Sequence, residues 1–191
     1  MPRAGLNEDR VVAEAERIAD EVGVANLTLA ALADRLGIRQ PSLYKHVAGL
    51  AGLHRSISIR AKFELADVLA RAAVGRSGAD AVRSMSHAYR RWAREHPGRY
   101  EAAQWAPPSG DEQAIEAGLA AVRICSEVLT CYGLEGDDAV DAIRVLRSAL
   151  HGFVALESAG GFGLPVDLGR SFDRLIEGIS AAFDRWVHDE A

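Results

Sequence analysis

Residues 28–47 read TLAALADRLGIRQPSLYKHV, a pattern typical of two short helices joined by a tight turn. Thr28 is a favourable N-cap, because its hydroxyl can accept hydrogen bonds from backbone amides two or three residues later. Gly37 follows the first apolar run, where a residue with positive φ readily ends a helix. Pro41 stands in the first turn of the second helix, where its missing N–H does no harm. The segment therefore predicts a helix-turn-helix unit.

The second helix of this unit separates apolar from polar side chains. Leu43 and Val47 are four residues apart and are predicted to point into the core. A helix-turn-helix places its second helix in the major groove of DNA. The residues that we expect at the DNA, including the helix-capping hydroxyl, are Thr28, Arg39, Gln40, Pro41, Ser42, Tyr44, Lys45 and His46.

These candidates divide by chemistry into base readers and phosphate contacts. Glutamine pairs with adenine, and arginine or lysine pairs with guanine. The candidate base readers are Arg39, Gln40, Ser42 and Lys45, with Pro41 against a thymine methyl group. Thr28, Tyr44 and His46 are expected at phosphates. Two alternatives stay open, since Tyr44 could instead pack against a helix and His46 could instead cap one.

The charge pattern agrees with a nucleic-acid surface in this region. The whole chain carries a net charge of −5, yet residues 35–62 contain six Lys or Arg and no acid. From Asp111 onward, fifteen acids stand against six bases. An acidic protein approaches DNA through a local basic surface, so the position of these cations matters more than the total. The alternative is an ordinary solvated basic helix face.

Composition and motifs exclude several classes of protein. With 49% hydrophobic and 26% charged residues in 191, the chain resembles an ordinary globular protein. It lacks an apolar run of membrane-spanning length and a secretory signal, so we expect a cytoplasmic protein without membrane contact. Cys125 and Cys131 are spaced to different sides of a helix, which predicts neither a disulfide nor a metal pair. No motif for a nucleophile, a phosphate loop or a metal site is present, so we expect no cofactor, and an enzyme is a remote alternative.

Helical periodicity continues through the rest of the chain, and strand-like alternation is almost absent. The breaks fall at residues 76–78, at Pro97, at residues 107–110, at Gly133 and at residues 159–165. The sequence therefore predicts an all-α fold of about nine helices. We expect a DNA-binding domain over residues 1–50 and a larger helical domain over residues 51–191.

The two helices nearest the C-terminus carry long apolar seams, which predict pairing with a second chain. Two such helices from each of two chains would form a four-helix bundle. The expected interface residues are Leu146, Leu150, Phe153, Phe172, Ile176, Ile179 and Phe183. Helix-turn-helix proteins usually act as symmetric dimers on palindromic half-sites, which favours this interpretation. The alternative is that both seams form the core of a single chain.

The N-terminal sixty residues resemble the tetracycline-repressor (TetR) family of bacterial transcriptional regulators. The matching elements are GVANLT at 23–28, LA at 32–33, LGI at 36–38 and LYKHV at 43–47. The resemblance implies a repressor that dimerises through its last two helices, binds an operator and responds to a small effector. Residues 150–157 (LHGFVALE) and 160–165 (GGFGLP) are similar to a subfamily named for a Trp-His-Gly motif, with Leu150 in place of the tryptophan.

The chain departs from the family pattern at two places that would touch DNA. Leu29 and Ala30 follow the N-cap, where the family often has a polar or basic residue. Residues 48–50 (AGL) stand where the family commonly has a lysine-rich turn. We therefore expect Arg55, Arg60 or Arg3 to supply the phosphate contacts.

The resemblance also implies an effector site among the middle helices. Its candidate residues are His87, Tyr89, Trp92, Trp105, Cys125 and His151, with Met85, Tyr100 and Phe153 as further possibilities. Aromatic residues at helical spacing are more often core, so a DNA-binding protein without a ligand stays an alternative. An activator is another, since repression is only the family's commoner mode.

Overall fold

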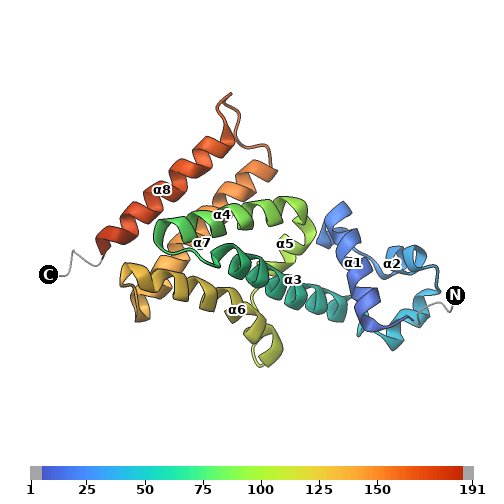
Figure 1. The fold of residues 1–191 in the computed structure, drawn as a ribbon. Coiled ribbons are helices and arrows are strands. Elements are labelled where there is room, and N and C mark those ends of the chain that lie inside the picture. The colour runs from blue at the N-terminus through green and yellow to red at the C-terminus, as the bar shows by residue number, and fades with distance from the viewer. Residues whose placement is uncertain (1–5, 187–191) are drawn as a thin grey trace. The chain divides into compact units, whose positions relative to one another are not determined.

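The computed structural model describes residues 6–186, and within them the chain is helical without a strand (Figure 1). Eight α-helices and three 3₁₀ helices follow one another: α1 Glu8–Val22, η1 Val24–Asn26, α2 Leu29–Leu36, η2 Gln40–Lys45, α3 Gly49–Ala73, α4 Gly78–Glu95, α5 Pro97–Ala103, α6 Glu112–Leu129, η3 Thr130–Tyr132, α7 Gly136–Ser158 and α8 Leu168–Trp186. The predicted all-α fold class is confirmed. The eight α-helices and η2 correspond to the nine helices expected.

The chain forms two compact units. Of the described residues, the first unit contains those up to Phe63 together with Glu95–Gly118, and the second contains Glu64–Arg94 and those from Leu119 onward. The first unit is therefore larger than the predicted DNA-binding domain, because α5 and the start of α6 pack with it. The boundary expected at residue 50 stays a prediction.

The helix-turn-helix forms as its local signals predict. The Thr28 hydroxyl accepts a hydrogen bond from the amide of Ala31 at 3.1 Å and so caps α2. Gly37 ends α2 in the left-handed conformation with φ of 66°. Leu43 is fully buried and Val47 is 7% exposed, so both contribute to the core of the first unit as expected. Burial of these two side chains fixes which face of η2 points outward.

Helix α5 packs against α1 at unusually close range. A Cβ atom added to Gly98 would lie 2.0 Å from the carbonyl oxygen of Ala19, so this position excludes a side chain. The carboxylate of Asp20 accepts hydrogen bonds from the backbone amide of Arg99 at 2.9 Å and from its Nε at 2.8 Å. The start of α5 is thereby clamped onto the C-terminal part of α1.

The other end of α5 is tied to α3. The Ser58 hydroxyl donates to the carbonyl oxygen of Ala102 at 2.8 Å. The Nζ atom of Lys62, whose side chain is nearly buried, donates to the carbonyl oxygen of Trp105 at 2.7 Å. These bonds satisfy carbonyl groups at and just beyond the end of a short helix. Helix α5 therefore braces α1, which packs on the helix-turn-helix, against α3.

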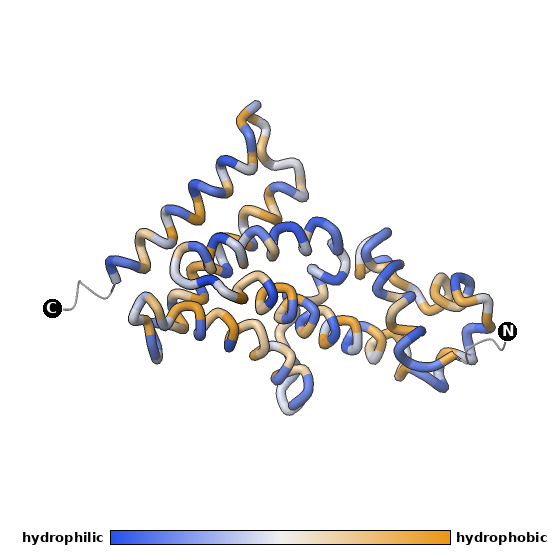
Figure 2. The backbone as a smooth tube through the Cα atoms, in the orientation of Figure 1, coloured by the Kyte–Doolittle hydropathy of each residue, from blue (hydrophilic) through white to orange (hydrophobic). Residues whose placement is uncertain are grey.

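In the second unit, α7 and α8 run as an antiparallel hairpin, and α4 packs with them. Hydrophilic and hydrophobic residues alternate along α8 at helical spacing (Figure 2). Arg90 on α4 forms a bidentate pair with Glu157 on α7, with N–O distances of 2.7 and 2.6 Å. The guanidinium also lies 4.9 Å from the ring centre of Phe172 on α8. One side chain thus joins three helices.

Candidate nucleic-acid interface

The second element of the helix-turn-helix is a 3₁₀ helix rather than the expected α-helix. It covers Gln40–Lys45, with Arg39 before it and His46 after it. Pro41 lies in its first turn, as the sequence predicts. A 3₁₀ helix rises more steeply per residue, which spreads six residues over a longer segment than an α-helix would. The segment 39–46, which we call the recognition segment, presents most of its polar side chains to solvent.

Exposure within the recognition segment matches the residues expected at the DNA. Tyr44 is 59% exposed, so its ring lies outside the core, and the alternative that it packs against a helix stays open. The exposed members are Arg39, Gln40, Pro41, Tyr44 and Lys45, and the half-buried members are Ser42 and His46. Thr28 is also exposed, although its hydroxyl already accepts the capping hydrogen bond. Their contact with DNA stays a prediction.

Four of the six cations in residues 35–62 are bound within the first unit. Arg35 pairs with Glu21, Arg60 pairs with Glu16 at 2.9 Å, and Lys62 is held by the Trp105 carbonyl. Arg55 pairs with Asp111 at 2.5 and 2.7 Å. Among residues 6–186, Arg39 and Lys45 form no ion pair, so the positive charge available to a partner concentrates on the recognition segment.

These ion pairs weaken the prediction that Arg55 and Arg60 contact DNA phosphates. Arg55 lowers the pKa of Asp111, mainly through their hydrogen bonds, and Asp111 also caps α6 by accepting from the amide of Ala114. Arg55 and Arg60 are thus ion-paired with acidic residues of the same unit, which leaves them little uncompensated charge for DNA phosphates. Arg3, the third candidate, lies outside the described residues.

The six residues expected at an effector site differ in burial and belong to both units. Tyr89 and Trp92 are buried in α4, whereas His151 is exposed on α7. Trp105 belongs to the first unit, where its ring meets that of His54 at 5.5 Å. Burial raises the pKa of the half-buried Cys125 to about 11, which keeps its thiol protonated at neutral pH. The location of an effector site stays open on these residues.

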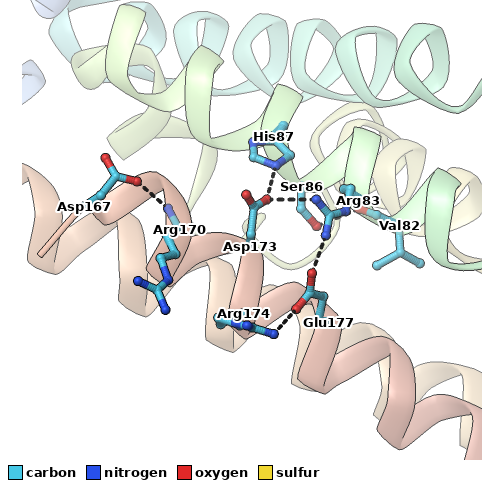
Figure 3. Close-up of polar contacts among 9 residues, drawn as sticks. All are labelled: Val82, Arg83, Ser86, His87, Asp167, Arg170, Asp173, Arg174 and Glu177. Atoms are coloured by element: carbon cyan, nitrogen blue, oxygen red, sulfur yellow. Dashed lines mark hydrogen bonds and ion pairs between the residues drawn. The ribbon is translucent and has the colours of Figure 1, made fainter.

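His87 belongs to a polar network between α4 and α8. Its Nε2 lies 2.8 Å from Oδ1 of Asp173, and Arg83 reaches the same oxygen at 3.3 Å. Arg83 also donates to Glu177 at 2.7 Å (Figure 3). Sequence reasoning treated His87 alone, because its partner lies 86 residues later in the chain.

The seven residues expected at a dimer interface mostly face inward. Phe172 and Phe183 are fully buried within one chain, and Phe153 is half-buried against the Phe172 ring at 4.9 Å. The remaining four are Leu146, Leu150, Ile176 and Ile179, each at most 8% exposed. Side chains buried in one chain have almost no surface to offer a second one. An interface through α7 and α8 has to use neighbouring residues.

Sequence reasoning missed the contact between α1 and α5. Gly98 follows Pro97, and the sequence pattern marks only Pro97, as a helix stop. Asp20 was not selected, because a single acid near the end of a helix carries no local signal. Only the approach of two helices distant in the sequence gives these residues their role.

Within residues 6–186, no group of three or more His, Cys, Asp or Glu side chains lies close enough to hold a metal ion. No helix in this part of the chain is long and apolar enough to cross a membrane.

Comparison with known proteins identifies the family. Residues 82–179 match the family model described as the tetracyclin repressor-like C-terminal domain. The chain is 39% identical to an HTH-type transcriptional regulator of Mycobacterium tuberculosis over 95% of its own length and 84% of the relative. It is 34% identical to the HTH-type transcriptional regulator YobS of Bacillus subtilis, over 87% of each chain.

Solved structures agree on the fold. The TetR family protein ActR of Streptomyces coelicolor, solved in complex with actinorhodin, superposes with a TM-score of 0.69 at 22% identity, covering 96% of this chain and 97% of ActR. The finer resemblance to the Trp-His-Gly subfamily stays a prediction. The family model and both relatives agree. The chain therefore belongs to the tetracycline-repressor family of helix-turn-helix transcriptional regulators.

Proposed function

We propose that this regulator is a repressor that binds a palindromic operator as a homodimer and is released by a small-molecule effector. It acts in the cytoplasm, and it acts by binding rather than by catalysis. One observation carries the proposal: Arg39 and Lys45 stand exposed and without ion pairs among residues 6–186, while neighbouring cations are tied to acids. Unpaired cations on the second element of a helix-turn-helix are suited to guanine and phosphate.

Base reading is assigned to the recognition segment. Gln40 carries the amide that can pair with adenine, and Arg39 and Lys45 carry the donors that can pair with guanine. Pro41 is exposed and can meet a thymine methyl group. Contacts of Tyr44 and His46 with phosphates would set the register without reading sequence.

The homodimer is assigned to small and apolar residues on α7 and α8 outside the core. On α8 they follow a heptad-like spacing of three and four residues: Leu168, Ser171, Leu175, Gly178 and Ala182. On α7 the same spacing runs through Val145, Ser148, Gly152 and Ala155. Each of these nine keeps part of its surface exposed in the single chain. Small residues at this spacing let helices approach closely, as in a four-helix bundle.

Release by an effector would have to change the position of the DNA-binding helices, and α5 is a helix of the first unit that is tied to both α1 and α3. It is clamped to α1 through Asp20 and Gly98 and to α3 through Ser58 and Lys62. An effector would act by binding more tightly to a dimer geometry that does not fit both half-sites. The ActR complex with actinorhodin supports a ligand-responsive role, since it shares this fold.

The test begins with selection of bound fragments from the source genome by the full chain at about 150 mM salt, since affinity for DNA depends on salt. We expect an enriched palindrome whose half-sites are spaced by about one helical turn or a multiple of it. Gln40→Ala and Lys45→Ala should each lose the enrichment. Arg144→Ala, which removes an exposed arginine from α7, is the matched control and should retain it.

The outcomes separate the proposal from its alternatives. Uniform binding without a motif, or equal loss in Arg144→Ala, would contradict sequence reading by the recognition segment. Transcription measured from the enriched site then distinguishes a repressor from an activator.

Leu175→Glu should shift the chain from dimer to monomer in sedimentation velocity, and an unchanged dimer would contradict the assigned interface.

A further inference from the structure

A nearly buried ion pair lies at the closed end of the α7–α8 hairpin. The side chains of Arg90 and Glu157 are 12% and 10% exposed, and their two hydrogen bonds measure 2.7 and 2.6 Å. Glu157 directly precedes Ser158, the last residue of α7, so the pair lies where the chain turns towards α8. Taking two charges out of water is costly, and only favourable geometry and hydrogen bonding offset the cost. The forked pairing of the guanidinium with the carboxylate therefore fixes α4 against the end of α7.

The guanidinium of Arg90 also faces two aromatic rings of the hairpin. It lies 5.3 Å from the ring centre of Phe153 on α7 and 4.9 Å from that of Phe172 on α8. Phe162, in the segment that joins the two helices, has its ring centre 4.8 Å from that of Phe153. A planar guanidinium can pair with a carboxylate through its edge and stack on a ring through its face, which an ammonium group cannot do. Arg90 is therefore in contact with both helices of the hairpin at once.

The neighbouring charges leave Arg90 as the main partner of Glu157. Arg94 also approaches the carboxylate, with Nη1 at 3.7 Å, but its side chain is exposed, so water screens its charge. The hydrogen bonds from Arg90 lower the pKa of Glu157, so the carboxylate stays ionised at neutral pH. The pair is therefore charged and almost closed off from water.

A second arginine of α4 provides a contrast. Arg83 pairs with Glu177 on α8 at 2.7 Å, and the two side chains are 41% and 47% exposed. Ion pairs that are open to water contribute little and hold their geometry loosely. The contacts given for Arg83 within residues 6–186 reach α8 alone, at Glu177 and Asp173 (Figure 3). Arg83 is therefore a suitable control for Arg90.

We propose that Arg90 and Glu157 are positioning residues for the homodimer, because they set the placement of α7 and α8 that lets their outward faces fit a second chain. This inference rests on the function proposed above. The assigned interface begins beside the pair, since Ala155 lies two residues before Glu157 and Ser171 lies directly before Phe172. An apolar pair of similar volume is often as stable as a buried ion pair, but it lacks a defined hydrogen-bonding geometry. The pair therefore contributes more to the geometry of the dimer than to the stability of the fold.

The first part of the test measures folding stability after both charges are removed. The double variant combines Arg90→Met, whose thioether can still pack on the two rings, with Glu157→Leu. Thermal unfolding is measured in the Leu175→Glu background, so that dimerisation does not raise the result. The double variant should move the unfolding midpoint by no more than about 4 °C, a small shift for a chain of this size. Arg90→Met alone should lower it by about 10 °C, because it leaves a nearly buried carboxylate without its main partner.

The second part measures the dimer under native conditions, through subunit exchange between two fluorescently labelled populations of the full chain. The double variant, without Leu175→Glu, should exchange about tenfold faster than the unaltered chain, because changes at an interface act mainly on dissociation. Arg90→Lys should also exchange faster, since it keeps the charge but loses the fork and the stacking. Arg83→Met, the matched control, should exchange at the unaltered rate.

The outcomes separate this proposal from the homodimer itself. An unaltered chain that is monomeric in sedimentation velocity would contradict the homodimer, and the role of the pair with it. A dimer whose exchange rate is the same in the double variant would overturn only the role of the pair. Unaltered exchange in Arg90→Lys, or equal acceleration in Arg83→Met, would show that charge on α4 rather than geometry is what matters. An equally large loss of stability in the double and single variants would make the pair a requirement of folding and would also overturn the proposal.

Discussion

Within the described part of the chain, cations are unpaired in the recognition segment, whereas they are ion-paired in the contact between α4 and α8. In the recognition segment, Arg39 and Lys45 extend into solvent without ion pairs among residues 6–186. Between α4 and α8, Arg83 and His87 are both bound to Asp173. The two regions look equally charged in the sequence. The difference teaches that a cation marks a binding surface only when the fold leaves it without an acidic neighbour.

The same comparison applies to the apolar seams. Leu43 and Val47 point into the core while the rest of their segment faces outward, as expected. The seams of α7 and α8 are also core, although they were expected at a dimer interface. Helical periodicity identifies a buried face, but it does not distinguish burial by the same chain from burial by a second one.

Phe172→Ala should have the largest effect, because it tests whether that seam is core. Deleting a fully buried aromatic ring typically costs about 3–5 kcal/mol in the free energy of unfolding. Chemical denaturation at two protein concentrations measures it. A variant with unchanged stability that only loses its dimer would contradict the assignment to the core.

Gly98→Ala tests the clamp between α5 and α1. The added Cβ would lie 2.0 Å from the Ala19 carbonyl oxygen, so the helices must separate, at a cost of about 1–3 kcal/mol in unfolding free energy. The control is Gly118→Ala on α6, where nothing lies within 4 Å of the new atom. There alanine should stabilise the helix by about 0.5–1 kcal/mol. Equal effects at the two positions would contradict the clamp.

Arg39→Ala and Arg55→Ala compare an unpaired arginine with a paired one. Loss of a bidentate base contact costs about 1–3 kcal/mol, so Arg39→Ala should lower operator affinity by about 5- to 150-fold. Arg55→Ala should change the affinity little, since its guanidinium is bound to Asp111. Fluorescence anisotropy with the selected operator measures both. If Arg55→Ala is the more damaging of the two, ion pairing is not what selects the DNA contacts.

Asp111→Asn should have the smallest effect, seen only in acid. The pKa of Asp111 is lowered in the folded chain by Arg55, so its stabilisation is present above the ordinary value of 3.8 and is lost as pH falls through the folded pKa. Removing the carboxylate should flatten the fall in unfolding free energy below about pH 4. Asp141→Asn is the control, and an equally flattened acid limb there would contradict the assignment.

Much of the fold could be predicted because its signals are local. Thr28, Gly37 and Pro41 act on backbone groups within a few residues, and each took the position that its chemistry indicates. The same holds for the break at residues 76–78 and for the left-handed Gly133. The helix type of η2 is an exception, because the sequence pattern does not distinguish a short α-helix from a 3₁₀ helix.

The candidate DNA contacts could also be predicted from local sequence, because nearly all of them lie on the outward side of one short segment. The phosphate contacts expected of Arg55 and Arg60 depended on what those residues meet elsewhere, and their acidic partners lie 56 and 44 residues away. The polar network between α4 and α8 has the same origin, since Arg83 and His87 lie 90 and 86 residues from their shared partner Asp173.

The sequence by itself determined where helices begin and end, which face of each is buried, and the family to which the chain belongs, because these depend on neighbours within one or two helical turns. Only the tertiary structure decided which cations stay unpaired, which seams are core, and why Gly98 has no side chain. Those properties depend on helices that meet across long separations in sequence, where the approach of a particular acid or carbonyl group sets the outcome.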